Sequence, residues 1–306
     1  MNLPRTSLII ASRDRPELLS DTITSVLKGD VVPTEIVIVD QSRVPHPMLG
    51  KLDAGRGRGE HGSEIRYLSV KSTGLSLGRN EGIATARYDI LAFIDDDMYV
   101  NCDWFTRLVE ALIKGGSQTV VSGQVRPYYS NHQEGFVPST NVAEEPVKYQ
   151  GRINKDVLFA GNMAIYRTAF DIIGRFNERL GPGTAFPSAE DSDLGFRLLE
   201  AGFSIQFEPK AVVYHRAWRS DRDFLPLRWN YGLGRGAFYA HYSSLRDRHM
   251  LHRMLIDIKN HVLAFPFHFP RQRLQAYGDL VLSWGILVGF FRWQTTQHMK
   301  ATAGKP

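Results

Sequence analysis

Short apolar runs rich in β-branched residues alternate with helix-forming segments over the first two thirds of the chain, and this alternation narrows the choice of folds. The strand-like runs are 7–11, 35–40, 65–70, 88–95 and 118–125, and the helical segments among them are 16–28, 77–86 and 103–114. The run EIVIVD at 35–40 is nearly all apolar, as is typical of strands that are covered on both faces. This order predicts an α/β fold with a Rossmann-like, mostly parallel, doubly wound sheet.

Two local patterns predict how these elements are joined. Asp14 is expected to cap the first helix, which carries Pro16 in its first turn. The Gly- and Arg-rich segment 55–62 predicts a surface loop, because no helix opens directly behind it to form a phosphate cradle.

The pattern changes in the last third of the chain. Residues 126–157 are polar and contain prolines, which predicts an irregular connection before strand character resumes at 158–167. A helix is expected at 192–202, closed by Gly202, and short strands are expected at 205–209 and 211–215. Beyond Arg216 the segments are aromatic, Arg-rich and helical. We therefore expect two domains, an α/β domain over 1–216 and a C-terminal helical extension over 217–306.

Charge is distributed unevenly along the 306 residues. The net charge of +5 combines −5 over residues 1–209 (22 Lys/Arg, 27 Asp/Glu) with +10 over residues 210–306 (15 Lys/Arg, 5 Asp/Glu). A basic tail suits an anionic partner such as a membrane leaflet or nucleic acid, although a solvated basic face explains it equally well.

The apolar stretch near the C-terminus bears on the same question. Its core, Leu280–Phe291, is 12 residues long, whereas a membrane span needs roughly 20. An interfacial or core helix is therefore expected, with peripheral membrane contact through 262–293 as one reading and ordinary packing as the other. The residue types that sit at lipid headgroups are Arg271, Arg273, Trp284, Arg292 and Trp293.

Cysteine usage and the N-terminus predict the compartment. Cys102 is the single cysteine, so there is no internal disulfide, and no Cys/His cluster has zinc spacing. The apolar run Leu8–Ala11 is too short for a signal peptide. A cytoplasmic protein, working at the cytosolic face of the membrane, is the expectation.

Acidic residues follow two of the predicted strands at the point where each strand ends. Asp40 ends the second strand, Asp95, Asp96 and Asp97 end the fourth, and the turn 12–14 follows the first. Because ligands bind beyond the carboxyl ends of strands in open parallel sheets, these groups should lie along one edge. Adjacent carboxylates repel one another, and an Asp-x-Asp can hold Mg²⁺ or Mn²⁺ together with substrate phosphates. Neither a calcium loop nor a GxxxxGK[ST] loop is present.

A second acidic centre lies in AEDSDLGFRLLEAG at 189–202. Glu190 and Asp191 stand at the start of a helix, where capping is the plain explanation and a general base for a hydroxyl nucleophile is the functional one. His215 ends a later strand and is a candidate nitrogen ligand, although a lone histidine is more often structural.

These motifs, in this order, resemble the family 2 glycosyltransferases, which have the A-type nucleotide-sugar transferase fold. The resemblance covers about residues 6–216, and each motif is weak alone whereas the ordered set is specific. The motifs are SLIIASRDRPELL, EIVIVDQS, GLSLGRNEGIATARYDILAFIDDD, FAGNMAIYR and AEDSDLGFRLLEAGFSIQFEPKAVVYH.

The resemblance implies roles for individual residues. Nucleotide contacts would come from Ser12, Arg13, Asp14, Asp40 (to the base, commonly uracil), Arg79 and Asn80. Metal and ribose contacts would come from Asp95, Asp96 and Asp97, with Asp97 the direct ligand and His215 a third metal contact. Gly161 and Asn162 would approach the donor sugar, and Asp191 would be the catalytic base with Glu190 beside it. The implied cofactor is Mn²⁺ or Mg²⁺.

The implied activity is transfer of a sugar from a nucleotide-diphosphate donor, commonly a UDP-sugar, to a hydroxyl of a saccharide or lipid-linked acceptor in cell-surface polysaccharide synthesis. It would proceed by single displacement with inversion. The sequence departs from the family at Asp40-Gln41-Ser42 and at Leu225–Trp229, which lacks the glutamine of the processive Gln-x-x-Arg-Trp motif. A non-processive enzyme is expected.

Two other readings stay open on the residues alone. A nucleotidyltransferase making an NDP-sugar uses a related sheet, but its Gly-rich turn after the first strand is absent from ASRDRP. A non-catalytic nucleotide- or nucleic-acid-binding module would leave the acidic clusters as solvated turns and the basic tail as the binding patch. With the glycosyltransferase reading, no nucleic-acid partner is expected.

Overall fold

The computed structural model describes residues 3–51, 62–129, 135–244, 247–269 and 272–303, with side chains to Thr296, and the backbone alone of 56–58. The chain divides into two compact units. Unit 1 comprises Met1–Asn177 and Leu194–Trp218, and unit 2 comprises Glu178–Asp193 and Arg219–Pro306. Residues 178–193 thus group with the C-terminal helices, which the contiguous bounds 1–216 and 217–306 do not anticipate.

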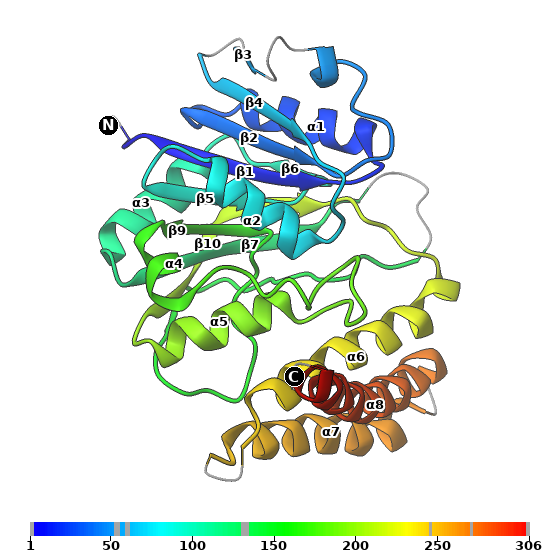
Figure 1. The fold of residues 1–306 in the computed structure, drawn as a ribbon. Helices are drawn as coiled ribbons and strands as arrows, with labels where there is room; N and C mark the ends of the chain where they lie inside the picture. The colour runs from blue at the N-terminus through cyan, green and yellow to red at the C-terminus, as the bar shows by residue number, and fades with distance from the viewer. Residues whose placement is uncertain are drawn as a thin grey trace. The chain divides into compact units, whose positions relative to one another are not determined.

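One mixed sheet forms the centre of unit 1 (Figure 1). Its strands are β1 (Thr6–Ser12), β2 (Glu35–Asp40), β3 (Arg56–Arg58), β4 (Glu64–Ser69), β5 (Ile90–Ile94), β6 (Met98–Val100), β7 (Thr119–Pro127), β8 (Val147–Tyr149), β9 (Asn162–Tyr166) and β10 (Ser204–His215). They run in the order β3-β4-β2-β1-β5-β9-β7-β10-β6, and β8 pairs with β10.

Strand direction divides this sheet into two parts. Adjacent strands within the run β4-β2-β1-β5 are parallel to one another, whereas β3 is antiparallel to β4 and β9 is antiparallel to both β5 and β7. In the parallel part Ser12 pairs with Asp40, so the carboxyl ends of β1 and β2 meet at one edge. The predicted α/β class with a C-terminal helical extension is confirmed. Parallel pairing occurs in the run β4-β2-β1-β5 and between β7 and β10, and the other strand pairs are antiparallel.

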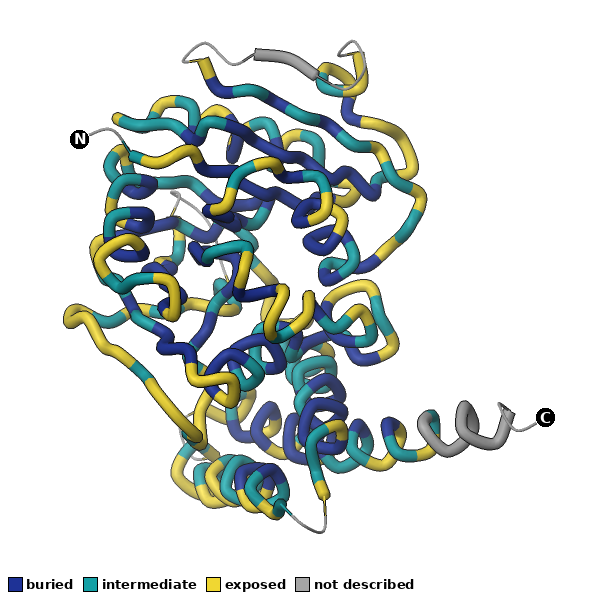
Figure 2. The backbone as a smooth tube through the Cα atoms, turned by 60° about the vertical axis from the view of Figure 1, so that its left-hand side comes forward, coloured by how far each residue is buried: buried dark blue, intermediate teal, exposed yellow. Residues whose placement is uncertain are grey.

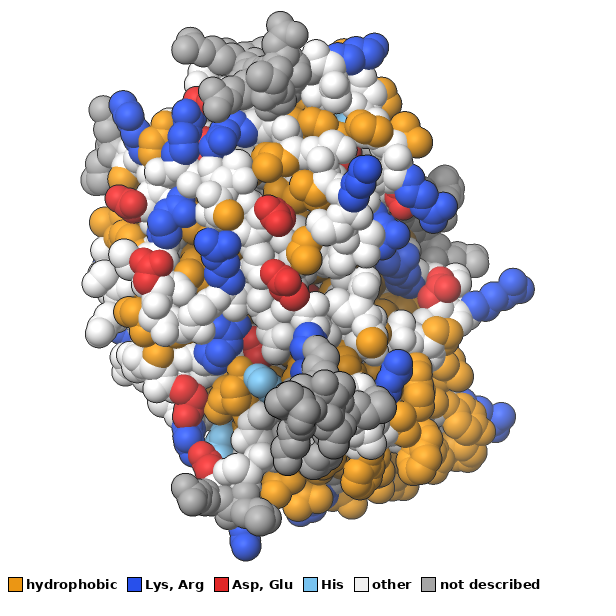
Figure 3. All heavy atoms as spheres, viewed as in Figure 1, with side chains coloured by type: hydrophobic (Ala, Val, Ile, Leu, Met, Phe, Trp, Pro, Cys, Tyr) orange, Lys and Arg blue, Asp and Glu red, His pale blue; other side chains and the backbone are white. Residues whose placement is uncertain are grey.

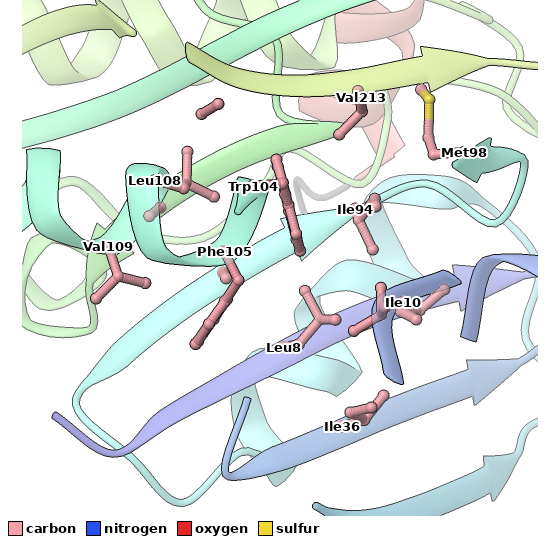
Figure 4. Packing of buried hydrophobic residues seen from close by; sticks show 14 of the residues in the cluster. Leu8, Ile10, Ile36, Ile94, Met98, Trp104, Phe105, Leu108, Val109 and Val213 are labelled. Atoms are coloured by element: carbon pink, nitrogen blue, oxygen red, sulfur yellow. The ribbon is translucent and has the colours of Figure 1, made fainter. Parts of the chain in front are cut away.

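Helices cover both faces of the sheet, which explains why every residue of β1, β2 and β5 is buried (Figure 2). The helices α1 (Pro16–Leu27) and α3 (Trp104–Gly115) pack on one face. On that side Trp104, Phe105 and Leu108 of α3 lie against strand residues such as Leu8 and Ile94 (Figure 4). The other face is covered by α2 (Leu75–Thr85), α4 (Thr168–Ile173) and the part of α5 (Glu190–Glu200) that belongs to unit 1.

Several local expectations differ from the structure. The capping prediction for Asp14 is wrong, because Arg15 occupies the cap position and Asp14 has a φ of 54°. The expected strands 205–209 and 211–215 are one strand, β10, whose register shifts between Glu208 and Val212. The segments 55–62 and 126–157 were expected to be irregular, but they contain the short strands β3 and β8. The strand β6 and the helix α4 were not anticipated.

Unit 2 contains three long helices, α6 (Phe224–Tyr242), α7 (His249–His268) and α8 (Arg273–Ala303). The helices α6 and α8 contact each other through glycines that lie on both helices. A Cβ atom at Gly236 would lie 2.1 Å from the Ile286 carbonyl oxygen, and one at Gly289 would lie 2.2 Å from the Leu233 carbonyl oxygen. The two backbones therefore approach so closely that no side chain fits between them at these points.

A buried carboxylate also holds the three helices together. Asp279 of α8 is 1% exposed and accepts hydrogen bonds from Arg228 of α6 (2.8 Å) and from the Nδ1 atoms of His261 (3.0 Å) and His268 (2.8 Å) of α7. Among the described residues, Arg273–Thr296 of α8 is also long and apolar enough, by length and composition, to cross a membrane, although 44% of its most apolar window is buried.

Candidate active site

The carboxyl ends of β1 and β5 bring two of the predicted site segments together in unit 1. These strands are parallel neighbours, so the residues that follow them lie at the same edge of the sheet. The Ser12 hydroxyl at the end of β1 donates a 2.7 Å hydrogen bond to Asp96, which follows β5. The threonine Thr22 of α1 donates to the Asp96 carbonyl at 2.9 Å and so anchors the acidic turn from a third element.

Each of the three adjacent aspartates faces a basic side chain. The Asp95 carboxylate accepts a 2.8 Å hydrogen bond from Arg79 of α2. One nitrogen of Arg15 lies 3.2 Å from an Asp96 oxygen and 3.1 Å from an Asp97 oxygen. The repulsion within the turn is therefore balanced by arginines of the same unit.

Burial distinguishes Asp96 from an ordinary surface aspartate. Desolvation and the neighbouring charge of Asp97 raise the pKa of Asp96 to about 6, against the opposing charge of Arg15 and the hydrogen bond from Ser12. The ionised form of Asp96 is therefore less favourable than that of a surface aspartate, and positive charge at the turn stabilises it.

His215 lies beside Asp97 because β10 ends where the antiparallel strand β6 begins. His215 pairs with Met98 in the sheet, and its Nε2 atom is 3.4 Å from Asp97 Oδ1. Its Nδ1 atom donates to the Pro138 carbonyl at 3.0 Å, which sets the ring orientation. Burial opposes the charged imidazolium, but the hydrogen bond to Asp97 outweighs this and raises the pKa of His215.

The donor set around Asp97 fits a divalent cation only in part. Among the residues the structure describes, no group of three or more His, Cys, Asp and Glu side chains is placed to hold a metal ion. The Asp97 carboxylate and the His215 Nε2 atom do face one another, and a metal-binding histidine typically donates its second N–H to a backbone carbonyl, as His215 does to Pro138. Because Mg²⁺ and Mn²⁺ commonly take one or two protein ligands plus substrate phosphates, the residues fit a cation that a bound diphosphate completes.

Asp40, a predicted nucleotide contact at the end of β2, organises the loop that follows this strand. Asp40 is 2% exposed, and its carboxylate accepts hydrogen bonds from the amides of Ser42 (2.9 Å) and His46 (3.1 Å) and from the Tyr67 hydroxyl (2.6 Å). Burial, followed by the hydrogen bond to Asp40, raises the pKa of Tyr67 to about 12. Asp40 therefore shapes the loop that follows β2.

Asp14 joins the turn after β1 to the turn after β2. Its amide donates to the Ser42 hydroxyl at 2.6 Å, and its carboxylate accepts from the Arg43 amide at 3.1 Å. Arg13 lies beside it, with 3.7 Å between the Arg13 Nε atom and an Asp14 oxygen. The two side chains are partly exposed to solvent, at 42% and 44%.

The two predicted asparagines are internal braces. The Asn80 amide forms paired hydrogen bonds with the backbone of Phe176, at 3.0 and 2.9 Å. Asn162 is fully buried and bonds Trp104 Nε1 (2.8 Å) and the carbonyls of Gln124 and Ala211. These side chains hold the sheet and its helices in place, and their predicted ligand contacts stay predictions.

Gly161 lies against the acidic turn for a steric reason. A Cβ atom at this position would lie 2.1 Å from the Asp95 Oδ2 atom. Any larger residue would therefore displace the Asp95 carboxylate, which makes Gly161 part of the same site.

Glu190 and Asp191 form the first turn of α5 and belong to unit 2. The residue before them, Ala189, has a φ of 71°, a conformation that non-glycine residues rarely adopt and that is often found at functional sites. Within unit 2, Asp193 accepts a 2.7 Å hydrogen bond from Tyr242 of α6, and Ser188 donates to α6 carbonyls. The first turn of α5 is thus held in a defined conformation by α6, and the role of Asp191 remains a prediction.

Arg15 is the functional candidate that sequence reasoning missed. It directly follows the predicted turn Ser12–Asp14, so its position one residue beyond a strand-end motif was the available signal. Nothing in the pattern indicated that its side chain would pair with the aspartates that follow β5. Only the parallel pairing of these strands brings them together.

Two known proteins resemble this chain in sequence over most of its length. A succinoglycan biosynthesis protein, ExoM of Rhizobium meliloti, is 29% identical over 223 residues, which cover 69% of each chain. A glucosyl-dolichyl phosphate glucuronosyltransferase of Haloferax volcanii is 24% identical over 257 residues, 81% of this chain and 78% of that protein.

A solved structure supports the fold. GalNAc-T7, crystallised with UDP, GalNAc and Mn²⁺, superposes with a TM-score of 0.54 at 19% identity, covering 71% of this chain and 44% of that chain. At this identity the likeness concerns the fold alone.

A sequence profile matches the chain over most of unit 1. The profile described as Glycosyl transferase family 2 covers residues 7–174, which include the acidic turn, Arg15 and Arg79. The matched range exceeds half of the chain, and the matched family consists of glycosyltransferases. The match therefore favours a glycosyltransferase over a nucleotidyltransferase or a non-catalytic binding module. The chain belongs to glycosyltransferase family 2 and is a glycosyltransferase.

Proposed function

We propose that the protein transfers one sugar per encounter, with inversion, from a UDP-sugar to a hydroxyl of a lipid-linked saccharide, in the presence of Mn²⁺ or Mg²⁺. The observation that carries this proposal is the strand-end cluster of unit 1. There Asp97, His215 and Arg15 gather charged and metal-binding groups at the edge where parallel sheets bind ligands. The route belongs to cell-surface polysaccharide synthesis, as the name of the ExoM relative suggests.

The donor would lie along the carboxyl ends of β1, β2 and β5. The loop that Asp40 shapes would receive the base, and Asp95 would face the ribose. Arg79 and Arg15 would neutralise the diphosphate from two sides. A cation held by Asp97 and His215 would supply charge stabilisation for the departing nucleoside diphosphate. The UDP and Mn²⁺ in the GalNAc-T7 structure support this choice of donor nucleotide and cation.

Asp191 would remove the proton from the acceptor. As the proton leaves, the acceptor oxygen attacks the anomeric carbon from the face opposite the diphosphate, and the bond to the diphosphate oxygen breaks. One displacement inverts the configuration and needs no covalent enzyme intermediate. The acceptor is proposed to be lipid-linked, because the Haloferax volcanii relative is named for a dolichyl-phosphate acceptor.

Non-processive transfer is supported by the missing glutamine and by the position of Arg228. The missing glutamine removes the processive motif, and the Arg228 guanidinium binds Asp279 (2.8 Å) and the Gly278 carbonyl (3.3 Å) within the helices of unit 2. This arginine has a structural partner inside unit 2, as expected if it does not hold a growing polysaccharide.

A two-stage experiment tests the proposal. Nucleotide sugars are first screened by thermal shift with and without Mn²⁺, because ligand binding raises the unfolding temperature by mass action. Transfer by the selected donor is then followed by mass spectrometry, and NMR determines the anomeric configuration of the product. We expect an inverted product one sugar longer than the acceptor.

Two substitutions assign the roles. Asp97→Asn should abolish the Mn²⁺-dependent thermal shift and reduce transfer by about 10²-fold or more, because the cation loses its carboxylate. Asp191→Asn should keep the thermal shift and reduce transfer by about 10²–10⁴-fold, because only the base is lost. Asp171→Asn, on the exposed surface of α4, is the matched control. Turnover at the wild-type rate by Asp191→Asn would refute the base, and a retained product configuration would refute single displacement.

A further inference from the structure

Apolar side chains gather on the surface of the helices of unit 2 (Figure 3). We define the apolar face as the large hydrophobic residues of α7 and α8 that are exposed to solvent. They are Leu255, Val262, Leu263, Phe267, Leu274, Tyr277, Leu280, Trp284 and Phe291. Two of the largest, Phe267 and Trp284, are 81% and 62% exposed. An apolar face of this kind marks an interaction surface.

The periodicity of α8 places four of its exposed apolar residues along one stripe. Tyr277, Leu280, Trp284 and Phe291 follow the i, i+3, i+7, i+14 spacing of a single helix face. The opposite side of α8 carries Gly285 and Gly289, which contact the backbone of α6. The helix therefore has one side committed to unit 2 and one apolar side turned to solvent.

The inner side of α8 argues against a membrane-spanning role. If α8 spanned a membrane, the Asp279 carboxylate would have to lie in the hydrocarbon. In the structure this carboxylate is instead buried among Arg228, His261 and His268 of the neighbouring helices. Extracting α8 as a span would break these hydrogen bonds and open the glycine contacts with α6. The long apolar helix is thus better described as a packed helix with an exposed face.

The exposed charges that α7 and α8 themselves carry, among the described side chains, have one sign. The carboxylates of α7 and of the part of α8 whose side chains are described are Asp257 and Asp279, and both are turned inward against arginine and histidine partners. Lys259, Arg273 and Arg292 are exposed. The face therefore combines apolar and aromatic side chains with a positive rim, which complements an anionic lipid headgroup layer better than a protein surface of mixed charge.

We propose that the apolar face of α7 and α8 docks on the surface of an anionic phospholipid bilayer, with the helices lying in the interfacial plane and not crossing it. Phe267 and Trp284 would enter the headgroup–acyl boundary, and Lys259 and Arg273 would contact lipid phosphates. This proposal concerns where the protein binds and is independent of the transfer reaction proposed above. Residues 270–271, between the two helices, lie outside the described residues.

Vesicle sedimentation with the full chain tests the partner. The probes are vesicles of phosphatidylcholine alone and of phosphatidylcholine mixed with phosphatidylglycerol. We expect binding to the anionic vesicles that weakens as salt is raised, and far weaker binding to the neutral ones. Absence of binding to anionic vesicles, or equal binding to both kinds, would overturn the proposal.

Substitutions test the surface. The pair Phe267→Ser and Trp284→Ser should weaken binding to anionic vesicles by about tenfold or more, because two large apolar groups no longer leave water. Ile172→Ser, which alters an exposed apolar residue of α4 in unit 1, is the matched control and should bind as the wild type does. Lys259→Glu with Arg273→Glu should remove the preference for anionic lipid while leaving the thermal unfolding midpoint unchanged.

Two further measurements separate docking from its alternatives. Alkaline carbonate should release the bound protein, whereas resistance to extraction would indicate a span and overturn the proposal. Brominated lipids should quench wild-type tryptophan fluorescence more than that of Trp284→Phe, a variant that keeps an apolar ring. If light scattering shows a dimer that Phe267→Ser and Trp284→Ser abolish, and no vesicles are bound, the occupant is a second copy and the proposal fails.

Discussion

At the scale of single residues, each of the three aspartates in the acidic turn has its own side-chain partner. Asp95 has Arg79, Asp96 has Ser12, and Asp97 has His215, while Arg15 is shared between the last two aspartates. A divalent cation is thus not needed to hold the turn together. It would instead compete with Arg15 for the same carboxylate oxygens, which makes Arg15 a built-in counter-charge.

Removing Arg15 should therefore separate stability from cation binding. We expect Arg15→Ala to lower the free energy of unfolding without metal by about 1–2 kcal/mol, because two buried carboxylates lose a shared donor that is itself partly exposed. The same variant should bind Mn²⁺ more tightly, since the competing guanidinium is gone. Thermal unfolding in EDTA and titration calorimetry with Mn²⁺ measure the two effects.

Arg13→Ala is the matched control for this prediction. Arg13 lies two residues away, and its ion pair with Asp14 is longer, at 3.7 Å, and exposed to solvent. It should leave both quantities nearly unchanged. Weaker Mn²⁺ binding by Arg15→Ala would show that Arg15 supports the cation and does not oppose it.

At the scale of elements, a buried glutamate joins the strands of the parallel half of the sheet. Glu35, the first residue of β2, accepts hydrogen bonds from Ser7 of β1 (2.5 Å), Arg66 of β4 (3.2 Å) and the amide and side chain of Arg87 (3.0 and 2.8 Å). Burial opposes ionisation of this carboxyl, but the hydrogen bonds from Ser7, Arg87 and Arg66 outweigh it and lower the pKa of Glu35.

A lowered pKa makes the contribution of Glu35 dependent on pH. The carboxylate stabilises the fold above its unfolded-state pKa of about 4.3, and this contribution is lost as the pH falls through the lower folded-state pKa. At neutral pH we expect Glu35→Gln to cost about 1.5–3 kcal/mol, because charged hydrogen bonds are replaced by poorer ones. The difference from the wild type should shrink below about pH 4.

Thermal unfolding midpoints across this pH range check the prediction. Glu64→Gln is the control, because Glu64 also pairs with Arg87 but is partly exposed, so its loss should cost less than about 1 kcal/mol. A Glu35→Gln deficit that stays constant down to pH 3 would mean that the charge of Glu35 is not the source of its contribution.

At the scale of the whole molecule, the two units are interleaved along the chain. Residues 178–193 leave the α/β unit, belong with the C-terminal helices, and carry Glu190 and Asp191 before the chain returns to unit 1 at Leu194. Within unit 2 this segment is held by Arg179, whose guanidinium lies 3.7 Å from the Trp293 ring centroid, and by the Asp193–Tyr242 hydrogen bond. The candidate base is therefore positioned by helices that lie more than thirty residues further along the chain.

This interleaving predicts the result of truncation. A chain ending after Trp218 should keep the sheet but lose order in residues 178–193, because their partners in α6 and α8 are gone. Limited proteolysis with mass spectrometry should show rapid cleavage there, and transfer should be lost while UDP still binds. Tyr242→Phe, which removes one hydrogen bond to Asp193, should show a smaller increase in cleavage. A truncated chain as resistant as the full chain would contradict the prediction.

The sequence by itself determined the features that depend on local periodicity and chain order. Alternating apolar runs specify buried strands and covering helices, and polar residues directly after strands mark the ligand-binding edge, so the α/β class, the strands β1, β2 and β5 and the acidic turn could all be predicted. The fit of the ordered motifs to a known family extended this to the enzyme class.

Only the tertiary structure decided which side chains meet. The approach of Arg15 to Asp97 and the internal bonds of Asn162 depend on pairing between strands and helices that are far apart in sequence. The placement of residues 178–193 with α6 and the apolar side of α8 depend on packing of the same kind. Local periodicity shows which face of an element is apolar, but not which element covers it. Burial depends on contacts between side chains from different elements, and only the fold brings those elements together.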